Sequence, residues 1–247
     1  MGAPAWPDAD ADHEDLLAIQ HRVAERAVFE DAGAPTPTAV ERAVHGGRNS
    51  PVVVGVDQAF DGDDAVSAAV AMADGRVIER ATAERETTIP YIPGLLSFRE
   101  GPAVEAAIEA LTVEPDLLLI DGSGRIHYRQ AGLATHIGVA VETPAVGVAK
   151  ALLCGRPRES LAGRRPAGVQ IPIEADDEVT APEGTIVGHA VQTRQFDSPR
   201  AINPVFVSPG HRVGHRRAAR IGLAACDGYK LPEPIRLADH AAGRATE

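Results

Sequence analysis

The sequence predicts an α/β fold, in which a mixed sheet joins a three-strand antiparallel meander to parallel β–α–β units and is flanked by helices. Two observations lead to this prediction. Apolar segments joined by Asp/Gly turns fill residues 52–84, a pattern typical of an antiparallel meander. Short apolar runs then alternate with helical patterns over residues 97–149, which indicates parallel strands joined by right-handed crossovers.

The predicted helices begin at recognisable capping patterns. An N-terminal helix is expected over 12–31, where apolar residues recur at helical spacing behind acidic capping candidates. The Ala34-Pro35-Thr36-Pro37 segment breaks that pattern, and a polar linker is expected to follow to about residue 50. Ser97 and Glu100 have capping-box spacing at the start of the next helix. The remaining helices are expected over 97–111, 132–142 and 215–226.

The predicted strands are short apolar runs bounded by turn residues. They cover 52–57, 65–72, 76–84, 117–121 and 145–149, with further strands near 168–173, 185–192 and 204–207. A meander followed by helix, strand, helix and strand is the skeleton of the ribonuclease-H-like fold. We therefore expect a single domain over residues 1–247, with a ribonuclease-H-like core at 50–150 and a flexible tail at 234–247.

The composition is that of a globular protein rather than a membrane or fibrous one. The chain has 247 residues, of which 44% are hydrophobic and 24% charged, enough for a sizeable core. No apolar run approaches the ~20 residues of a spanning helix, and the acidic N-terminal segment lacks the basic and apolar parts of a secretory signal. Two cysteines cannot form a disulfide framework in a chain this long. These features predict a soluble, reduced, cytoplasmic protein, with a monomer as the default state.

The charge balance is strongly acidic. Lys and Arg number 24 against 35 Asp and Glu, which gives a net charge of −11. Only Lys150 and Lys230 are lysines, so the other 22 basic residues are arginines. This composition favours adaptation to a salty cytoplasm, where salt screens the repulsion between surface carboxylates. A GC-rich genome would produce the same exchange of lysine for arginine. A negative net charge usually argues against a nucleic-acid partner, but an acidic surface can still contain a local basic groove that binds one.

Three acidic residues occur where the predicted fold would bring them together. Asp57 ends the first strand, Glu100 is near the start of the first crossover helix, and Asp121 ends the fourth strand. Active sites of open α/β sheets gather at strand ends near the switch in strand order. Carboxylates that close repel one another unless a cation lies between them, and their oxygens suit Mg²⁺ or Mn²⁺. One such aspartate alone is more often a turn or cap residue, but three together favour a metal site.

Several long motifs occur in a fixed order along the chain. They are Gly55-Val56-Asp57, Pro90-Tyr91-Ile92-Pro93-Gly94 running on to Ser97-Phe98-Arg99-Glu100-Gly101, Pro115-Asp116 running on to Asp121-Gly122-Ser123-Gly124-Arg125-Ile126-His127, Gly132-Leu133-Ala134-Thr135-His136-Ile137-Gly138, Pro144-Ala145-Val146-Gly147-Val148-Ala149-Lys150 and Asn203-Pro204-Val205-Phe206-Val207-Ser208-Pro209-Gly210-His211. With these motifs the chain closely resembles the endonuclease V family over residues 12–230. It departs from the family at Tyr128, where a proline is usual.

The resemblance implies a DNA repair endonuclease that recognises deoxyinosine, the product of adenine deamination. Enzymes of this family hydrolyse the second phosphodiester bond on the 3′ side of the lesion and leave a 3′-hydroxyl and a 5′-phosphate. The implied cofactor is Mg²⁺, for which Mn²⁺ can substitute, and the implied partner is inosine-containing DNA or RNA.

The resemblance also assigns catalytic roles. Asp57 and Asp121 would bind Mg²⁺ directly, and Glu100 would complete the acidic cluster. His211 would orient or deprotonate water. Lys150 would offer a point charge to the phosphate, although a lysine at a strand end can also be merely solvated.

The resemblance places base recognition in the loops around these acids. Tyr91, between two prolines, would be a wedge inserted into the base stack. A tyrosine packed on the core is the alternative. His127 is the side chain expected near the flipped hypoxanthine, and a narrow pocket would be shaped by Gly94, Leu96, Gly122 and Gly124.

Three other functions are compatible with parts of this pattern. An inosine-specific ribonuclease would use the same acids, and a non-cleaving lesion-binding module would need only the pocket. An actin-like kinase or ATPase also begins with a meander and a strand-end aspartate, but its phosphate turn needs Gly and Thr. The segment Asp57-Gln58-Ala59-Phe60 is too bulky for that turn. A magnesium-dependent nicking assay separates the endonuclease from the kinase or ATPase and from the lesion-binding module.

Overall fold

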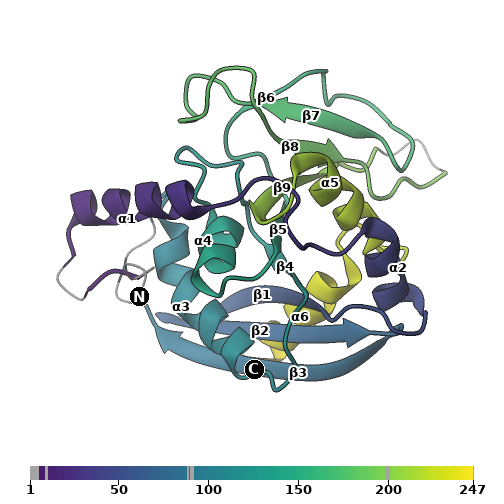
Figure 1. Cartoon of the computed structure of the whole chain (residues 1–247), viewed down its shortest axis with the longest axis horizontal. Coiled ribbons are helices and arrows are strands. Elements are labelled where there is room, and N and C mark those ends of the chain that lie inside the picture. The colour runs from purple at the N-terminus through teal and green to yellow at the C-terminus, as the bar shows by residue number, and fades with distance from the viewer. Residues whose placement is uncertain (1–5, 9–10, 88, 90–91, 198–200, 247) are drawn as a thin grey trace.

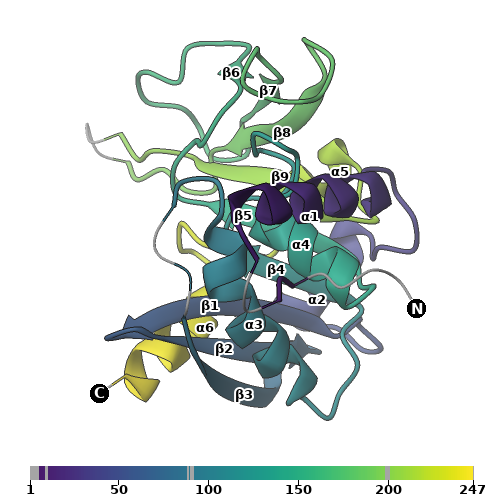
Figure 2. The ribbon, with the colours of Figure 1, turned by 90° about the vertical axis from the view of Figure 1, so that its left-hand side faces the viewer.

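One mixed sheet forms the centre of the molecule (Figures 1 and 2). The computed structural model describes residues 6–8, 11–87, 89, 92–197 and 201–246. Within these residues the sheet has nine strands in the order β3-β2-β1-β4-β5-β9-β8-β7-β6. The strands are β1 (Val53–Asp61), β2 (Asp64–Ala73), β3 (Arg76–Glu86), β4 (Leu117–Asp121), β5 (Ala145–Ala149), β6 (Arg156–Pro157), β7 (Gln170–Glu174), β8 (Ile186–Val191) and β9 (Val205–His211). The helices are α1 (His13–Arg26), α2 (Pro37–His45), α3 (Leu96–Glu109), α4 (Leu133–Ala140), α5 (His215–Ala224) and α6 (Glu233–Ala245).

The strand pairing confirms the predicted mixed sheet. Strands β1, β2 and β3 form an antiparallel meander, whereas β4 pairs in parallel with both β1 and β5. The chain therefore has the ribonuclease-H-like arrangement. Beyond β5 the sheet continues through antiparallel β9, β8, β7 and the two-residue strand β6, which was not predicted.

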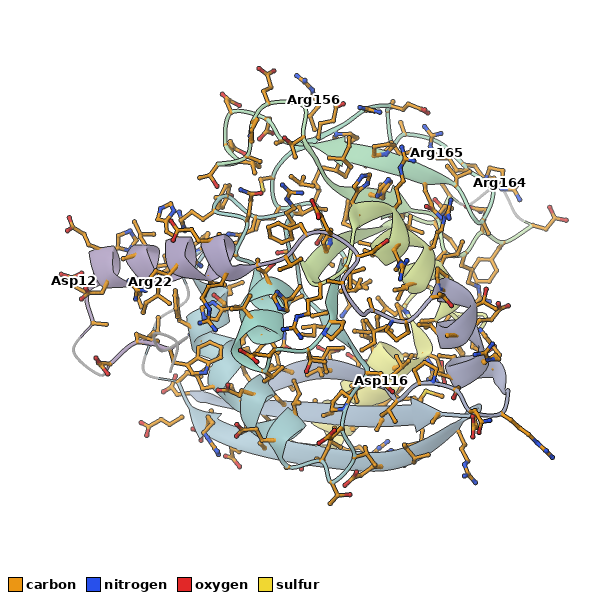
Figure 3. All side chains as sticks on the ribbon, viewed as in Figure 1. Asp12, Arg22, Asp116, Arg156, Arg164 and Arg165 are labelled. Carbon is orange, nitrogen blue, oxygen red and sulfur yellow. The ribbon has the colours of Figure 1, made fainter. Side chains whose placement is uncertain are left out.

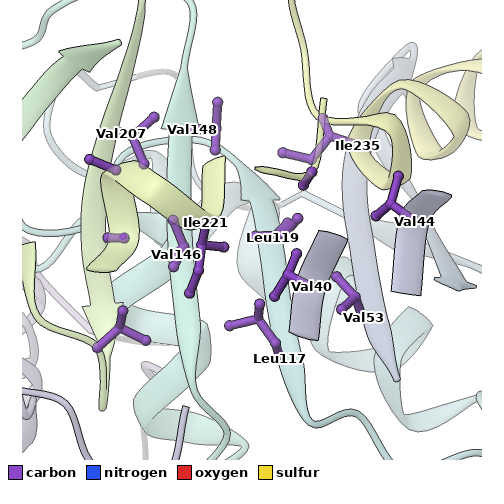
Figure 4. Close-up of a cluster of buried hydrophobic side chains, with 14 of the residues drawn as sticks. Val40, Val44, Val53, Leu117, Leu119, Val146, Val148, Val207, Ile221 and Ile235 are labelled. Atoms are coloured by element: carbon purple, nitrogen blue, oxygen red, sulfur yellow. The ribbon is translucent and has the colours of Figure 1, made fainter. Parts of the chain in front are cut away.

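Each face of the sheet is covered by its own set of helices. Because side chains alternate along a strand, Leu117 and Leu119 of β4 face one side and Leu118 and Ile120 the other. The first pair joins a buried cluster with α2, α5 and α6, drawn in Figure 4. The second pair packs against α3 and α4. We call these the α6 face and the α3 face.

The C-terminal segment is a packed helix, so the predicted flexible tail at 234–247 is wrong. Helix α6 buries Ile235, Ala238 and Ala242 against β1 and β2. Gly55 of β1 permits the close approach, because a methyl group there would overlap the backbone of Pro234. The error arose because the segment carries no family motif, whereas small residues at helical spacing are the signal of its buried face.

Replacing Gly55 with alanine is expected to lower the free energy of unfolding by ~3 kcal/mol, the upper part of the range for overpacked cores. The added methyl group would meet backbone atoms, which cannot rotate away as a side chain can. Gly243→Ala on helix α6, the helix that packs against Gly55, is the matched control. A methyl group there meets no neighbouring atom, so stability should stay the same or rise by up to ~1 kcal/mol. Equal unfolding midpoints in urea for both variants would contradict the packing described for α6.

Three predicted boundaries near the N-terminal half also change. Helix α1 ends at Arg26 rather than at residue 31, and its start is confirmed by a capping box between Asp12 and Asp15. The predicted linker contains α2, whose first turn is Thr36 as N-cap followed by Pro37. Proline was interpreted as a breaker, but it is well suited to the first helical position. Ser97 is buried inside α3 and does not cap it.

Within the described residues, no helix combines the length and apolar character needed to cross a bilayer.

Candidate active site

Two aspartates lie side by side at the end of the parallel strands. Val56 of β1 pairs with Ile120 of β4, so Asp57 and Asp121 follow at adjacent positions. Asp57 is buried, and its Oδ1 accepts a hydrogen bond from the backbone N–H of Gln58 (2.8 Å). By the alternation of each strand both carboxylates belong to the α6 face. The sheet thus brings together the two residues expected to hold a metal ion.

Two further charged residues face this aspartate pair. Lys150 follows β5, and its Nζ lies 2.6 Å from Oδ2 of Asp121. Asp239 of α6 is exposed, and its charge acts on both Asp57 and Lys150. Burial lowers the pKa of Lys150, but Asp121, Asp57 and Asp239 outweigh that effect, so its pKa is raised and it stays an ammonium ion.

Glu100 approaches the same sheet edge from the α3 face. The side-chain amide of Gln58 donates hydrogen bonds to Oε2 of Glu100 (3.2 Å) and to the backbone carbonyl of Asp121 (3.4 Å). Gln58 points away from Asp57 because neighbouring residues of a strand face opposite sides. It therefore links the carboxylates of the two faces, and the three predicted acids lie around one edge of the sheet.

The pKa values indicate that Lys150 balances only part of the negative charge at this edge. Burial, followed by the charge of Asp121, raises the pKa of Asp57 to about 8. The same two causes raise the pKa of Glu100 to about 7. In addition, Oδ2 of Asp57 is buried without a hydrogen-bond partner among the described residues. A cation at this edge would relieve each of these costs.

The donors fit a hard divalent cation held chiefly by Asp57 and Asp121. Carboxylate oxygens are the ligands that Mg²⁺ and Mn²⁺ prefer. Within the part of the chain that the structure describes, no three acidic, His or Cys side chains converge closely enough to share one ion. Glu100 approaches from the opposite face of the sheet, and Nζ of Lys150 lies against Oδ2 of Asp121. An ion bound here would be held by carboxylate oxygens of Asp57 and Asp121.

A small pocket opens on the α3 face beside Glu100. Its volume is about 120 Å³, well above the ~10–15 Å³ that one water needs. Four of the residues predicted to bind the base line it, and they are Gly94, Leu96, Gly122 and His127. The pocket therefore adjoins the catalytic edge, as the recognition of a base next to a cut requires.

Hydrogen bonds fix the pocket wall at Gly94. Its carbonyl oxygen receives bonds from Nε2 of Gln20 (2.8 Å), Nη2 of Arg129 (3.2 Å) and Nε2 of His127 (3.1 Å). Nδ1 of His127 accepts from the backbone N–H of Arg129 (3.2 Å), which leaves the proton on Nε2. Burial lowers the pKa of His127 to about 4, so the ring is neutral at pH 7. Both ring nitrogens are engaged with backbone, so His127 shapes the pocket and offers no free hydrogen-bonding group to a ligand.

The other two residues predicted to bind the base, Gly124 and Tyr91, are not among the described residues that line the pocket. Gly124 is needed for close packing on β9, since a methyl group there would overlap the carbonyl of Pro209 and its N–H donates to Ser208 Oγ (2.9 Å). It does not line the pocket. Tyr91, the predicted wedge, lies outside the described residues together with Pro90.

The predicted catalytic role of His211 is wrong. Strand β9 runs antiparallel to β5, with Phe206 opposite Ala149 and His211 opposite Ala145. Ala145 and Ala149 are four residues apart along β5, a distance of roughly 13 Å. His211 is therefore at the edge of the sheet opposite to the one where Lys150 lies. Its Nδ1 accepts the N–H of Val28 (3.3 Å), and burial lowers its pKa to about 4. His211 thus holds the segment after α1 against the end of β9.

Sequence reasoning missed three residues of this site. Asp239 lies in the segment taken for a tail, and the apolar residues around it on α6 were the available signal. Gln58 directly follows Asp57, so strand alternation alone would have placed it on the Glu100 side. Gln20 is a fully buried polar residue on α1, and nothing local in the sequence indicates its distant partner Gly94.

The chain is similar to known proteins over nearly its whole length. Residues 38–240 match the Endonuclease V family. The chain is 53% identical to endonuclease V of Haloarcula marismortui, over 97% of this chain and 94% of that protein. The structure resembles endonuclease V from Streptomyces avermitilis, with a TM-score of 0.79 and 36% identity over 98% of this chain and 95% of that one. It also resembles Ciona intestinalis endonuclease V in complex with a 24mer DNA containing an inosine followed by a ribo-adenosine, with a TM-score of 0.72 and 23% identity over 94% and 96% of the two chains.

Proposed function

This chain belongs to the endonuclease V family of nucleases, and from that membership we propose that it cuts DNA at deoxyinosine. The bond hydrolysed is the second phosphodiester on the 3′ side of the lesion, and the products carry a 3′-hydroxyl and a 5′-phosphate. The single observation that carries the proposal is a base-sized pocket directly beside two paired carboxylates whose negative charge is only partly balanced by nearby positive charge. The inosine in the DNA bound to Ciona intestinalis endonuclease V supports the choice of lesion.

The cofactor that the site fits is Mg²⁺, with Mn²⁺ as a substitute, and nucleases of this family are generally metal-dependent. Asp57 and Asp121 would hold the ion, while Glu100 and Asp239 add negative charge around it. When bound, the ion lowers the pKa of water and stabilises the charge that develops on the phosphate.

The protein's own groups position the substrate. Lys150 would bind a phosphate oxygen with its exposed ammonium group, while Asp121 positions that group at the sheet edge. Gln58 holds the Glu100 carboxylate at the sheet edge, and the bonds from Gln20 and Arg129 to Gly94 keep the pocket open for the flipped base. We assign Tyr91 the role of wedge from the sequence resemblance alone.

The setting we propose is a cytoplasmic monomer in DNA repair. Cys154 and Cys226 are both free thiols, as expected for a reducing compartment. The second candidate substrate is inosine in RNA, because the sheet-edge acids would act on either backbone.

Matched oligonucleotides test this proposal. Four substrates would carry inosine or adenine at one position of a DNA or an RNA strand, and initial cleavage rates would be measured with Mg²⁺. We expect rapid cleavage of the deoxyinosine strand and none of the adenine strands. Faster cleavage of the RNA strand would make the protein an inosine-specific ribonuclease. Binding to inosine without cleavage of any strand would make it a lesion-binding module.

A further inference from the structure

We propose that an exposed strip of arginine and aromatic side chains beside the catalytic edge binds the unpaired nucleotides 3′ of the cut. The strip is made of Arg164 from the loop between β6 and β7, Arg194 and Phe196 from the segment after β8, and Tyr229 and Lys230 from the loop between α5 and α6. Arg164, Phe196 and Tyr229 are exposed, and Arg194 and Lys230 are half-buried. We call it the arginine–aromatic surface. The proposal rests on the proposed function, which sets the direction of the strand.

Contacts between these side chains form one continuous surface. The guanidinium of Arg194 lies 4.2 Å from the ring centre of Phe196 and 5.8 Å from that of Tyr229. Arg164 donates to the carbonyl of Phe196 (2.7 Å) and lies with Arg156 and Arg165 on the outer β6–β8 part of the molecule (Figure 3). Phe196 and Tyr229 are 46% and 50% exposed, which is unusual for rings of this size. Exposed rings alternating with arginines are typical of surfaces that stack nucleic-acid bases.

Lys230 joins this surface to the catalytic edge. Its backbone carbonyl accepts a hydrogen bond from Thr193 (2.6 Å), which fixes the loop between α5 and α6 against the residues after β8. Phe206 of β9 pairs with Ala149, next to Lys150, and Val205 pairs with Val191 at the end of β8. The residues after β8 that hold Lys230 therefore lie at the same edge of the sheet as Lys150. Lys150 in turn contacts Asp121. A backbone leaving the carboxylates therefore meets Lys230 and then Tyr229.

The local charge suits a polyanion even though the whole chain is acidic. Residues 120–236 contain 15 Lys and Arg against 11 Asp and Glu, a net charge of +4. The rest of the chain has 9 against 24, a net charge of −15. Near the surface, Asp197 lies 3.5 Å from Arg164, and Glu233 pairs with Arg236. Among the described residues, Arg194 has no carboxylate partner, so its charge is available to a phosphate.

The position of the surface assigns it to the 3′ side. The pocket opens on the α3 face, whereas Asp57, Asp121 and Lys150 are on the α6 face. Leu231 of the α5–α6 loop packs on the same α6 face. A strand with its inosine in the pocket must cross the sheet edge before its scissile phosphate reaches the carboxylates. Nucleotides beyond that phosphate then continue toward Lys230 and Tyr229. Stacking on these rings is largely independent of counterions, so it would persist in salt that weakens phosphate contacts.

Binding of tailed oligonucleotides tests the proposal. Three single-stranded DNAs carry one deoxyinosine: a core that ends just past the cut, the core with six more 3′ nucleotides, and the core with six more 5′ nucleotides. Dissociation constants are measured by fluorescence anisotropy in EDTA, which prevents cleavage. We expect the 3′ tail to tighten wild-type binding and Tyr229→Ala to weaken binding of that DNA by about tenfold or more. Phe196→Ala is the second variant, and both are checked for an unchanged melting temperature.

The controls separate stacking from charge and from folding. Tyr229→Phe keeps the ring and should bind like wild type. Arg80→Ala removes an exposed arginine from β3, at the opposite end of the sheet, and should change nothing. Arg194→Ala should lower the magnitude of the slope of log K against log salt concentration by about one, the value for one phosphate contact. Tyr229→Ala should leave that slope unchanged. Normal binding of the 3′-tailed DNA by both alanine variants of the rings, or equal losses on all three DNAs, would overturn the proposal. A wild-type protein with no preference for inosine over adenine would instead overturn the proposed function.

Discussion

Asp121→Asn is expected to lower the turnover number on an inosine-containing duplex by ~10³-fold or more. The substitution keeps the shape of the side chain but removes one of the two charges that would hold the cation. A loss of several kcal/mol of charge stabilisation in the transition state has this size. Binding of the duplex should stay the same or tighten, because a negative charge near the phosphate is removed and Lys150 loses its partner.

Asp116→Asn is the matched control for that variant. Asp116 precedes the same strand β4 and lies at its other end (Figure 3), where its carboxylate accepts the N–H of Val52 (2.8 Å). An asparagine oxygen can accept that bond, so single-turnover cleavage should remain near the wild-type rate. An Asp121→Asn protein that retains half of the wild-type rate with Mg²⁺ would remove Asp121 from the catalytic site.

Stability and activity are both expected to depend strongly on salt. The acidic part of the chain, residues 1–119 and 237–247, has a net charge of −15 and repels itself at low ionic strength. The Debye length falls from about 8 Å at 0.15 M salt to about 3 Å at 1 M, so KCl should screen this repulsion. We expect the melting temperature to rise by ~10 °C between 0.1 and 2 M KCl, equivalent to about 3 kcal/mol for a chain of this size. The relative from the halophilic archaeon Haloarcula marismortui supports salt adaptation as the cause.

Phosphate contacts respond to salt in the opposite direction. Counterion release weakens protein–DNA binding as salt rises. The two trends together predict maximal cleavage well above physiological ionic strength. Melting temperature and initial rate would be measured over the same KCl series. A steady decline of both from the lowest salt upward would leave genome composition as the explanation of the arginine-rich, lysine-poor sequence.

The parts of the site that follow strand order could be predicted from the sequence. Asp57 and Asp121 each follow a clear apolar run, and parallel pairing of β1 with β4 makes them neighbours. Strand β1 itself continues past Asp57 to Asp61. The pocket residues in the loop after β4 follow for the same reason. These predictions depended on local pattern and one rule of topology.

The parts that depend on strand direction and on distant packing could not be predicted. His211 ends an apolar strand just as Asp121 does, but β9 is antiparallel to β5, so its end lies at the opposite edge. Nothing within the 204–211 segment specifies that direction. Asp239 belongs to the site only because α6 crosses β1 at Gly55, a contact between residues far apart in the sequence.

The central claim is that a cation held at the paired aspartates drives cleavage next to inosine. Mapping of the product ends on a duplex with a single deoxyinosine, with Mg²⁺ and with EDTA, tests it most directly. We expect one nick, at the second phosphodiester on the 3′ side of the inosine, with a 3′-hydroxyl and a 5′-phosphate, and only in the presence of Mg²⁺. Cleavage in EDTA, or the same cleavage of a duplex with adenine in place of inosine, would contradict it.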